Sequence, residues 1–319
     1  MRSKCRPVAT APSPACGGGL GWGQAGAALS SRPHPGLPPH AGEGANAAAA
    51  LLITLSLCSG IAQARDFKVC AEPNNLPYSN RDGAGYENRI AALLAQELQA
   101  HLVLVPIAQN GPGFIRATLG RGRCDALLAM PVDNDQTAVT APYYRSGWVF
   151  VTRAQQQLDL QGFDDPQLRE LRIGVPVVGE GSDTPALIAL GARGLVQHLH
   201  PYSIGGDIGS GDDATAQMMA DLAQGRIDVA LAWAPAAGYH AARQSVPLRL
   251  SPTPDSDRGI PLALSIGVAV QQRNTALRDE LDRALQRRHR DIAAILAEYH
   301  VPQFDARAAA SPAAAGGGR

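Results

Sequence analysis

The sequence predicts an α/β fold with two lobes, each a mostly parallel β-sheet flanked by helices, and a hinge formed where the chain crosses twice between them. Three features support this prediction: an internal repeat, short apolar strands alternating with helices in each copy, and a final strand and helix too short for a third lobe. The predicted boundaries are a leader at 1–64, the first lobe at 65–152 and 256–305, the second lobe at 153–255, and a tail at 306–319.

The repeat has an offset of 103 residues. Residues 117–129 read ATLGRGRCDALLA and residues 220–232 read ADLAQGRIDVALA, with seven of 13 positions identical. Each copy has the pattern of a helix end, a glycine that terminates the helix, and a short apolar strand. The repeat therefore predicts two halves of similar architecture.

Strands and helices alternate upstream of each copy. We expect strands at 67–71, 102–107, 171–175 and 195–199, and helices at 87–98, 114–119 and 214–222. Another helix should begin at Pro185 with Thr184 as its N-cap. A strand at 262–270 and one helix at 275–299 return to the first lobe. The chain then crosses between the lobes near Arg153 and near Ser256, which predicts a hinge.

Composition and the N-terminal segment bear on partners and location. From Arg65 onward the chain has 24 Lys/Arg and 27 Asp/Glu, a balance that disfavours a nucleic-acid or anionic-membrane partner. Residues 47–64, AAAALLITLSLCSGIAQA, resemble a secretory signal cut after Ala64, and the apolar run is short for a membrane span. We expect a periplasmic protein without stable membrane insertion; an uncleaved N-terminal anchor is the alternative.

Two cysteines, Cys70 and Cys124, follow the predicted cleavage site. In an oxidising compartment they suggest a disulfide, which would close a loop of about 55 residues and contribute about 4 kcal/mol. The alternative is two separate buried thiols. Two cysteines without nearby histidines do not complete a tetrahedral metal site, so we expect no metal and no cofactor.

Ligands of open parallel sheets lie beyond the carboxyl ends of the strands. In this sequence those ends fall at 72–78, 130–135, 179–184 and 233–239, which should face one cleft between the lobes. The candidate residues for binding a ligand or partner are Glu72, Asn74, Asn75, Tyr78, Tyr86, Glu87, Asp133, Tyr143, Tyr144, Glu180, Ser182, Asp183, Thr184, Trp233 and Tyr239.

Each group also has a purely structural interpretation. Asn74 and Asn75 with Pro77 are typical of a turn, Glu87 suits the start of a helix, and the aromatic residues could be core. Acidic residues at 180 and 183 offset the positive end of the helix that follows, which disfavours an anionic ligand.

Metal binding elsewhere is a weaker hypothesis. His198 and His200 would share one face of the expected strand, but no third ligand has matching spacing. Asp207, Asp212 and Asp213 lie in a glycine-rich segment without the spacing of a calcium loop. We favour surface histidines and a solvated turn.

Five segments carry a resemblance to a known family: CAEPNNLPYSNRDGAGYENRIA (70–91), APYYRSGWVFVTR (141–153), GVPVVGEGSDTPA (174–186), PYSIGGD (201–207) and GRIDVALAWAPAAGYHA (225–241). Together they resemble the MxaJ/XoxJ family, the J proteins of bacterial methanol oxidation, over residues 65–304. The resemblance implies a type II periplasmic-binding-protein fold. It also implies association with a PQQ-dependent methanol or alcohol dehydrogenase and its c-type cytochrome.

The wider superfamily, family 3 of the solute-binding proteins, usually serves ABC importers of amino acids. Its amino-acid-binding members carry an arginine for the ligand carboxylate and an aspartate for the ligand ammonium. The matching positions here hold Asp133 and Trp233. An aspartate would repel a carboxylate, so amino-acid import is disfavoured.

Three hypotheses of function follow. The leading one is a non-enzymatic accessory that binds the dehydrogenase, its cytochrome or a small ligand in the cleft. The alternative is a transport receptor for a small polar or cationic solute. A lyase similar to cyclohexadienyl dehydratase is disfavoured, because the sequence lacks the carboxylate clamp and a positioned acid–base group.

Overall fold

The computed structural model describes residues 65–107, 113–178, 184–204 and 213–304, which belong to one compact unit, Ala62–Arg319. The predicted signal segment and the tail at 306–319 lie outside the described residues. Within the described ranges, no helix is long and apolar enough to cross a bilayer.

The two halves of the chain contain the same arrangement of three parallel strands. In the first half the order is β4 (His101–Pro106), β1 (Asp66–Ala71) and β5 (Ala126–Pro131). In the second half it is β9 (Leu199–Ile204), β8 (Ile173–Val178) and β10 (Val229–Trp233). The strand in which each sequence repeat ends, β5 or β10, pairs in parallel with the first strand of its own half. The repeat therefore marks equivalent positions in two similar units.

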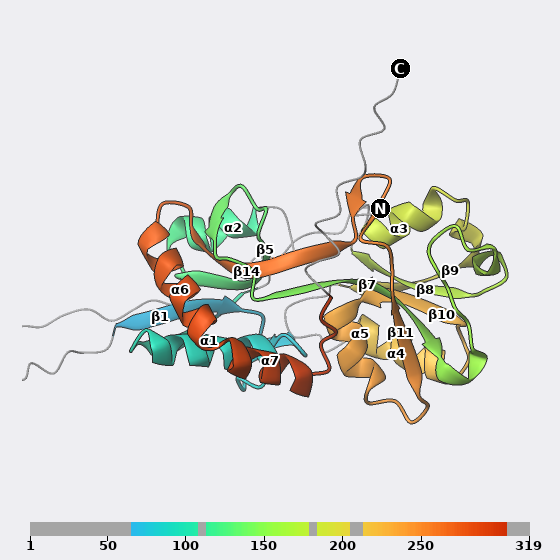
Figure 1. Cartoon of the computed structure of the whole chain (residues 1–319), viewed down its shortest axis with the longest axis horizontal. Coiled ribbons are helices and arrows are strands. Elements are labelled where there is room, and N and C mark those ends of the chain that lie inside the picture. The colour runs from blue at the N-terminus through green and yellow to red at the C-terminus, as the bar shows by residue number, and fades with distance from the viewer. Residues whose placement is uncertain (1–64, 108–112, 179–183, 205–212, 305–319) are drawn as a thin grey trace, which may run out of the picture. The chain divides into compact units, whose positions relative to one another are not determined.

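Two long antiparallel strands join the halves, β7 (Tyr144–Arg153) and β14 (Ala263–Gln271) (Figure 1). Residues 144–147 of β7 pair with β14, and β14 pairs with β5. Residues 148–152 pair with β10. The change of partner at Gly147–Trp148 makes one continuous hydrogen-bonded path of strands. Each half therefore has its own mostly parallel sheet, as the sequence predicts, and β7 and β14 connect the two sheets.

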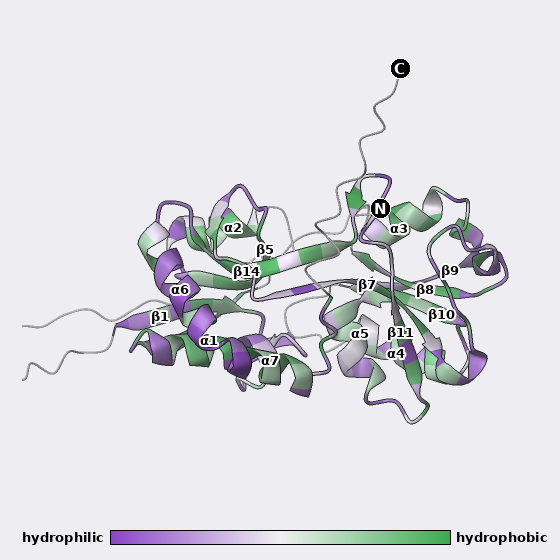
Figure 2. Ribbon diagram, in the orientation of Figure 1, coloured by the Kyte–Doolittle hydropathy of each residue, from purple (hydrophilic) through white to green (hydrophobic). Residues whose placement is uncertain are grey.

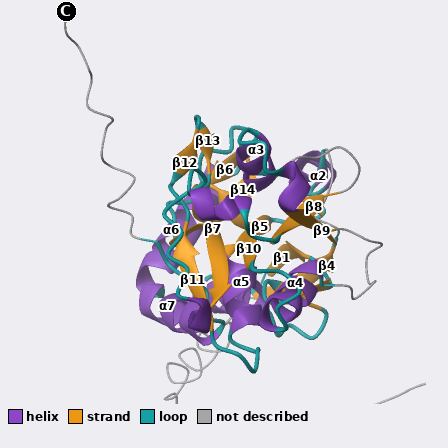
Figure 3. Cartoon of the chain, turned by 90° about the vertical axis from the view of Figure 1, so that its right-hand side faces the viewer, coloured by secondary structure: helices purple, strands orange, loops and turns teal. Residues whose placement is uncertain are grey.

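Smaller elements complete the fold. Short strands extend or flank the sheet: β6 (Thr137–Val139) on β14, β11 (Leu248–Pro252) on β7, and the pairs β2 (Asn74–Asn75) with β3 (Ser79–Asn80) and β12 (Ser256–Asp257) with β13 (Ile260–Pro261). The α-helices are α1 (Tyr86–Glu97), α2 (Phe114–Ala117), α3 (Pro185–Gly191), α4 (Ala214–Ala223), α5 (Ala234–Ala241), α6 (Thr275–Arg287) and α7 (His289–Glu298). Helices lie on both sides of the strands (Figure 3).

The repeated Gly-Arg-x-Asp motif has the same structural role in both halves. Gly122 and Gly225 have φ of 65° and 75°, the left-handed conformation that glycine adopts without steric cost. Three residues after each glycine, an aspartate carboxylate accepts a hydrogen bond from a backbone N–H at or just before the start of the neighbouring strand. Asp125 accepts from Lys68 N at 2.8 Å and Asp228 from Arg172 N at 3.0 Å. Each motif thus ties its strand to the first strand of its half.

Apolar side chains from both strands and helices form the core. In the first half, α1, α6 and α7 pack on β1, β5 and β14 through fully buried residues such as Ile90, Leu94 and Leu281. In the second half, Phe150 and Leu231 on neighbouring strands contribute to a core that also includes Leu190 of α3. In Figure 2, α6 is mainly hydrophilic and the strand β14 on which it packs is mainly hydrophobic. Burial of one face of each helix explains why the amphipathic patterns were predictive.

Three expected elements differ from the structure. The helix expected at 275–299 breaks at Arg288, whose φ and ψ of −98° and 13° end α6 before α7 begins; both helices can then face the same core. The strand expected at 195–199 is instead β9, which begins four residues later at Leu199, because Leu195 is buried in the core and Val196 is 64 % exposed. Proline is tolerated within β9 because this strand lies at the edge of the sheet.

The third difference concerns the helix expected at 114–119. It ends at Ala117 and continues as a 3₁₀ turn over Leu119–Arg121. His198 lies in a 3₁₀ turn and His200 in β9, so the two do not share a strand face as expected. Within the described residues, no group of three or more His, Cys, Asp or Glu side chains is arranged to hold a metal ion. Asp207 and Asp212 lie outside those residues.

The expected disulfide between Cys70 and Cys124 is present, with the two Cα atoms 5.5 Å apart. It connects β1 to the segment that leads into β5. Both cysteines are almost fully buried, beside Leu119 and Leu127 in a small apolar cluster. The covalent link and the Asp125 hydrogen bond therefore hold the same two strands together.

Replacing both cysteines, Cys70→Ser with Cys124→Ser, should lower the free energy of unfolding by about 4 kcal/mol, since the unfolded chain regains the entropy of a loop of about 55 residues. Urea unfolding followed by circular dichroism measures this difference. Dithiothreitol should lower the stability of the native protein by a similar amount and leave the variant unchanged. Equal stability of the variant and the native protein would contradict the prediction.

Candidate functional site

A cavity of about 220 Å³ lies where the ends of several strands meet. Its lining comes from both halves of the chain, with Glu72 following β1, Pro131 ending β5 and Trp233 ending β10. The complete lining is Glu72, Asn75, Tyr78, Glu87, Ala129, Pro131, Tyr144, Trp233, Leu264 and Ile266. The carboxyl ends of β1, β5 and β10 thus contribute to one cavity, as the rule for open parallel sheets leads one to expect.

Two acidic side chains, Glu72 and Glu87, line this cavity. Glu87 is only 5 % exposed. Burial is the main cause that raises the pKa of its carboxyl, and the nearby carboxylate of Glu72 adds to it. Together they raise the pKa to about 8. Glu87 is therefore mainly neutral at pH 7. No cationic side chain is among the described residues that line the cavity.

Local backbone geometry places Glu87 at the cavity. Helix α1 begins directly after Gly85, where any side chain would meet the carbonyl of Tyr78 at 2.1 Å. The Asn88 side-chain oxygen accepts hydrogen bonds from Gly85 N at 3.1 Å and Asn80 N at 2.9 Å. The start of the helix is therefore fixed against the β2–β3 hairpin. Only glycine at position 85 permits this approach, and it positions Glu87 on the first turn.

Two tyrosines, Tyr78 and Tyr144, line the cavity, and Tyr86 and Tyr143 pack against them. The ring centroids of Tyr78 and Tyr86 are 5.5 Å apart, and those of Tyr143 and Tyr144 are 5.0 Å apart. The hydroxyls of Tyr86 and Tyr144 are 3.2 Å apart and share a hydrogen bond. Burial raises the pKa of each of these four phenols above its ordinary value, so all four remain neutral. These tyrosines offer aromatic faces and hydroxyl groups rather than charge.

Trp233 also lines the cavity. It ends β10 and is the N-cap of α5, whose second residue is Pro235. Its ring packs edge-on against Trp148, with centroids 6.4 Å apart. Trp148 is 8 % exposed and belongs to β7 at the point where that strand changes partner. The position of Trp233 is therefore linked to the strand that connects the two halves.

The structure brings together six of the 15 residues predicted for the cleft and places six others elsewhere. Six line the cavity: Glu72, Asn75, Tyr78, Glu87, Tyr144 and Trp233. Tyr86 is fully buried in the core, Tyr143 packs against that core, and Asn74 and Asp133 are exposed away from the lining. Glu180, Ser182 and Asp183 lie outside the described residues.

Two further predicted residues have structural contacts. The Thr184 hydroxyl caps α3 by accepting a hydrogen bond from Leu187 N at 3.2 Å. Tyr239 stacks on Tyr299 with centroids 6.0 Å apart, and the guanidinium of Arg243 lies over the Tyr239 ring, 3.3 Å from its centroid. These contacts give Thr184 and Tyr239 roles that need no ligand.

Sequence reasoning missed the apolar part of the lining and one ion pair. Leu264 and Ile266 of β14 line the cavity, although only their place in an apolar strand marked them. Asp213 caps α4, accepting from Thr215 N and Ala216 N, and lies 2.6 Å from Nε2 of His240. Burial would raise the pKa of Asp213, but the His240 hydrogen bond and the helix amides together hold it below its ordinary value. This aspartate is a structural link between α4 and α5.

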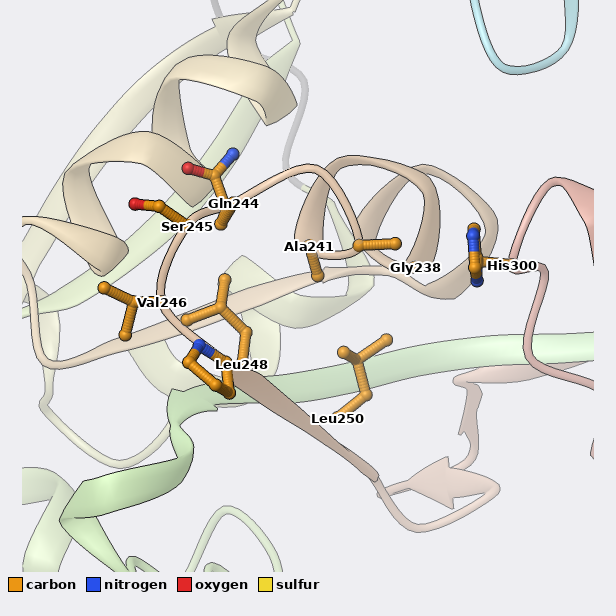
Figure 4. Close-up of a pocket in the computed structure, with 10 residues that line it drawn as sticks. Gly238, Ala241, Gln244, Ser245, Val246, Leu248, Leu250 and His300 are labelled. Atoms are coloured by element: carbon orange, nitrogen blue, oxygen red, sulfur yellow. The ribbon is translucent and has the colours of Figure 1, made fainter.

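A second cavity, of about 380 Å³, lies between α5 and the loop leading into β11 (Figure 4). Leu248, Leu250 and Val246 give it an aliphatic floor, and Gln244, Ser245 and His300 lie at its margin. It has no carboxylate or guanidinium in its lining, and none of the predicted residues reaches it. The acidic aromatic cavity is therefore the candidate site.

Comparisons with known proteins agree with this arrangement. Residues 67–302 match the model for the bacterial extracellular solute-binding proteins, family 3. Protein MoxJ of Methylorubrum extorquens is 32 % identical over 244 residues, which cover 74 % of this chain and 80 % of the relative. Protein MoxJ of Paracoccus denitrificans is 29 % identical over 280 residues, 81 % of this chain and 95 % of the relative.

Solved structures give the same result. The periplasmic binding protein XoxJ from Methylobacterium extorquens AM1 is 33 % identical with a TM-score of 0.61, covering 75 % of this chain and 99 % of that one. MxaJ from Methlophaga aminisulfidivorans MPT has a TM-score of 0.63 at 23 % identity and covers 75 % of this chain and all of that one. The chain belongs to family 3 of the bacterial extracellular solute-binding proteins and, within it, to the MxaJ/XoxJ family.

Proposed function

We propose that this protein is a non-enzymatic periplasmic accessory of a PQQ-dependent methanol or alcohol dehydrogenase, and that it binds the dehydrogenase, its c-type cytochrome or a small ligand in the acidic aromatic cavity. The observation that carries the proposal is a cavity lined from both halves of the chain, in a member of the MxaJ/XoxJ family. The protein would carry no cofactor of its own. Export would follow from the secretory signal expected at residues 47–64.

The lining favours binding over catalysis. Its polar groups are two carboxyls, one amide, and phenols whose pKa values are raised by burial. No His, Ser or Cys is among the described lining residues, so they offer no nucleophile with an adjacent base. His240 is engaged with Asp213 at 2.6 Å outside the lining.

The mechanism is a hinge. Because β7 pairs with β14 at one end and β10 at the other, bending at Gly147–Trp148 would change the separation of the cavity walls. A bound group shifts the protein toward a closed form only through tighter binding to that form. Contacts that span Glu87 and Trp233 supply such a difference, because these two residues belong to different halves.

The burial of Glu87 also favours a binding role. A carboxyl with its pKa raised to about 8 makes folding less favourable as pH rises, and a well-packed apolar side chain would avoid this loss. Features that reduce stability are concentrated at functional sites. Glu87 is such a feature, and it faces the cavity.

A transport receptor for a small polar or cationic solute is the second candidate. The observation that favours it is the small size of the cavity, about 220 Å³, together with its two carboxyls. Native mass spectrometry after mild purification separates the candidates. If one metabolite of constant mass stays bound, the result supports a receptor. If no metabolite stays bound and the protein captures a dehydrogenase, the result supports the accessory role.

The tagged protein should recover a quinoprotein dehydrogenase from periplasmic extract of the producing bacterium. Trp233→Ala should reduce the recovery at least about tenfold, since a buried aromatic anchor contributes on the order of 2 kcal/mol at an interface. Val196→Ala, at a 64 % exposed position away from the cavity, is the matched control and should recover as much as the native protein. Quantitative mass spectrometry measures the recovery, and a lack of any dehydrogenase would refute the accessory role.

Glu87→Gln should make the protein more stable than the native form as pH rises. The pKa of Glu87 is about 8 in the folded protein against 4.5 for an unperturbed carboxyl. The unfolded chain thus loses its proton first, so native stability is full below about pH 4.5 and falls as pH rises to about 8. The fall is at most about 1.4 kcal/mol per pH unit, and the glutamine variant should lack it.

Urea unfolding of both proteins at pH 5, 6, 7 and 8 measures the difference. Glu97→Gln is the control of opposite sign, because hydrogen bonds from Arg287 and Arg288 lower the pKa of Glu97. The stability that ionised Glu97 contributes is present above its unfolded pKa and is lost in acid. Glu97→Gln should therefore be no more stable than the native protein at high pH. Parallel pH profiles for the native protein and Glu87→Gln would show that Glu87 is not a buried acid.

A further inference from the structure

We propose that the outer edge of β11, with the cavity of about 380 Å³ beside it, binds an extended segment of a partner protein as an added antiparallel strand. The segment carries apolar side chains at alternate positions and an acidic side chain between them. This surface is separate from the acidic aromatic cavity, because none of the described residues lines both. It is defined by unpaired backbone groups, an uncharged apolar groove and one exposed arginine.

The hydrogen bonds at the two ends of β11 fix which of its backbone groups face β7. At one end Pro247 O accepts from Ala154 N at 2.9 Å, and at the other Thr253 N donates to Trp148 O at 3.1 Å. The backbone groups of successive residues in an antiparallel strand point alternately to its two sides. Every second residue from 247 to 253 therefore bonds to β7, and the residues between them face outward.

Leu248 and Leu250 are two of these outward-facing residues. They lie opposite Arg153 and Val151 of β7 in pairs that exchange no backbone hydrogen bond, so their N–H and C=O groups point away from that strand. In the described part of the chain, β7 is the only strand that pairs with β11, and neither leucine forms a backbone hydrogen bond with another segment. An edge of this kind is a template for pairing with another chain.

The same two leucines form the floor of the cavity. Leu250 lies opposite Val151, whose side chain packs in one core with α5, so the leucine side chains face that helix. Figure 4 shows Leu248 and Leu250 on one side of the opening and Ala241 and Gly238 of α5 on the other. Side chains directly across from each other on paired strands share a face, so alternate side chains of an added strand would enter this cavity. Its volume equals roughly a dozen water molecules at ~30 Å³ each, which is room for two aliphatic side chains.

The charges at the edge select the side chains of the partner. The described lining of the cavity has no carboxylate or guanidinium, so a charged side chain buried there would lack a partner. Arg249, between the two leucines, points to the opposite face, and its side chain is 47 % exposed. It donates to Asp159 at 2.8 Å through one nitrogen, and a guanidinium has further donors for a second carboxylate. An acidic residue directly across from Arg249 would form a cross-strand pair of opposite charge.

A second copy of this chain fits the edge less well. Antiparallel pairing of two β11 strands through both leucines would place Arg249 of one copy directly opposite Arg249 of the other. Like charges directly opposite each other in a sheet are destabilising. A partner segment with an acidic residue at this position replaces that repulsion with attraction, and it is therefore the occupant that the edge favours.

Fluorescence anisotropy of a labelled peptide, Gly-Ser-Leu-Glu-Leu-Ser-Gly, mixed with the purified protein tests the proposal. We expect saturable binding with a Kd below about 1 mM. N-methylation of both leucine nitrogens removes the donors that face β11 and should weaken binding at least about tenfold. N-methylation of the glutamate nitrogen, which faces solvent, is the matched control and should leave the affinity unchanged. A lack of saturable binding, or equal binding of the leucine-methylated peptide, overturns the proposal.

Leu250→Pro removes an outward N–H and keeps the hydrogen bonds to β7, and proline already occupies the next outward position, Pro252. It should weaken the peptide at least about tenfold, whereas Val196→Ala should not. Circular dichroism confirms that both variants are folded. Unchanged peptide affinity in folded Leu250→Pro would contradict the proposal.

Arg249→Glu tests the charge of the partner segment without changing the backbone. The native protein should bind the glutamate peptide about threefold more tightly than Gly-Ser-Leu-Lys-Leu-Ser-Gly, because an exposed ion pair contributes modestly. Arg249→Glu should reverse this preference. The same preference in both proteins would rule out an acidic residue across from Arg249 and overturn the proposal.

Two further outcomes would assign the groove to another occupant and so overturn the proposal. Tighter peptide binding by a form that ends at Phe304 than by the full chain would assign the groove to residues 305–319 of this chain. A dimer in sedimentation velocity that Leu250→Pro dissociates would assign it to a second copy. Neither outcome affects the function proposed for the acidic aromatic cavity, which Trp233→Ala tests independently.

Discussion

The change of partner within β7 is the interaction on which the rest of the structure depends. One continuous strand pairs with β14 over 144–147 and with β10 over 148–152. Gly147 marks the change, and a side chain there would meet Leu262 O and the Phe304 ring, each at 2.7 Å. The absence of a Cβ lets β7, β14 and the C-terminal segment approach closely. Two halves with equivalent strand orders are thereby held at a fixed register.

The C-terminal segment reinforces this connection. After α7, the Tyr299 hydroxyl donates to Ala84 O in the loop before α1, and the Tyr299 ring stacks on Tyr239 of α5. Farther on, Ser146 Oγ donates to Pro302 O at 3.1 Å and Phe304 N to Arg145 O at 2.9 Å. A segment that contacts both halves and β7 would resist hinge bending, so the energy of closure includes its rearrangement. Ligand contacts in the cavity must outweigh that cost.

Glu87 differs from other buried charged groups in the described part of the chain. Arg193, for example, is paired with Asp164 and Asp257 at 2.7 and 2.8 Å, and the resulting hydrogen bonds raise the pKa of its guanidinium. Glu87 has instead a second acid nearby, and burial keeps it protonated. A local conflict of this kind is expected at functional sites. It is the physical basis for the proposed binding role.

The sequence by itself determined the elements whose signals are local. The glycines at 122 and 225 end helices because they adopt positive φ, Thr184 caps α3, and the amphipathic patterns of α1 and α4 are accurate to within a residue or two. The family and the Cys70–Cys124 pair were also evident, since both depend on residue identities in order.

Only the tertiary structure decided which of these elements meet. That β7 is antiparallel and shared by both halves follows from pairing between residues far apart in the chain, which no local pattern encodes. The same holds for the site: Glu72, Glu87 and Trp233 line one cavity, whereas Asp133 and Asn74, chosen by the same rule, are exposed and do not line it. Strand ends identify the edge of a sheet, but the direction of each side chain there depends on turn geometry and on neighbours from distant segments.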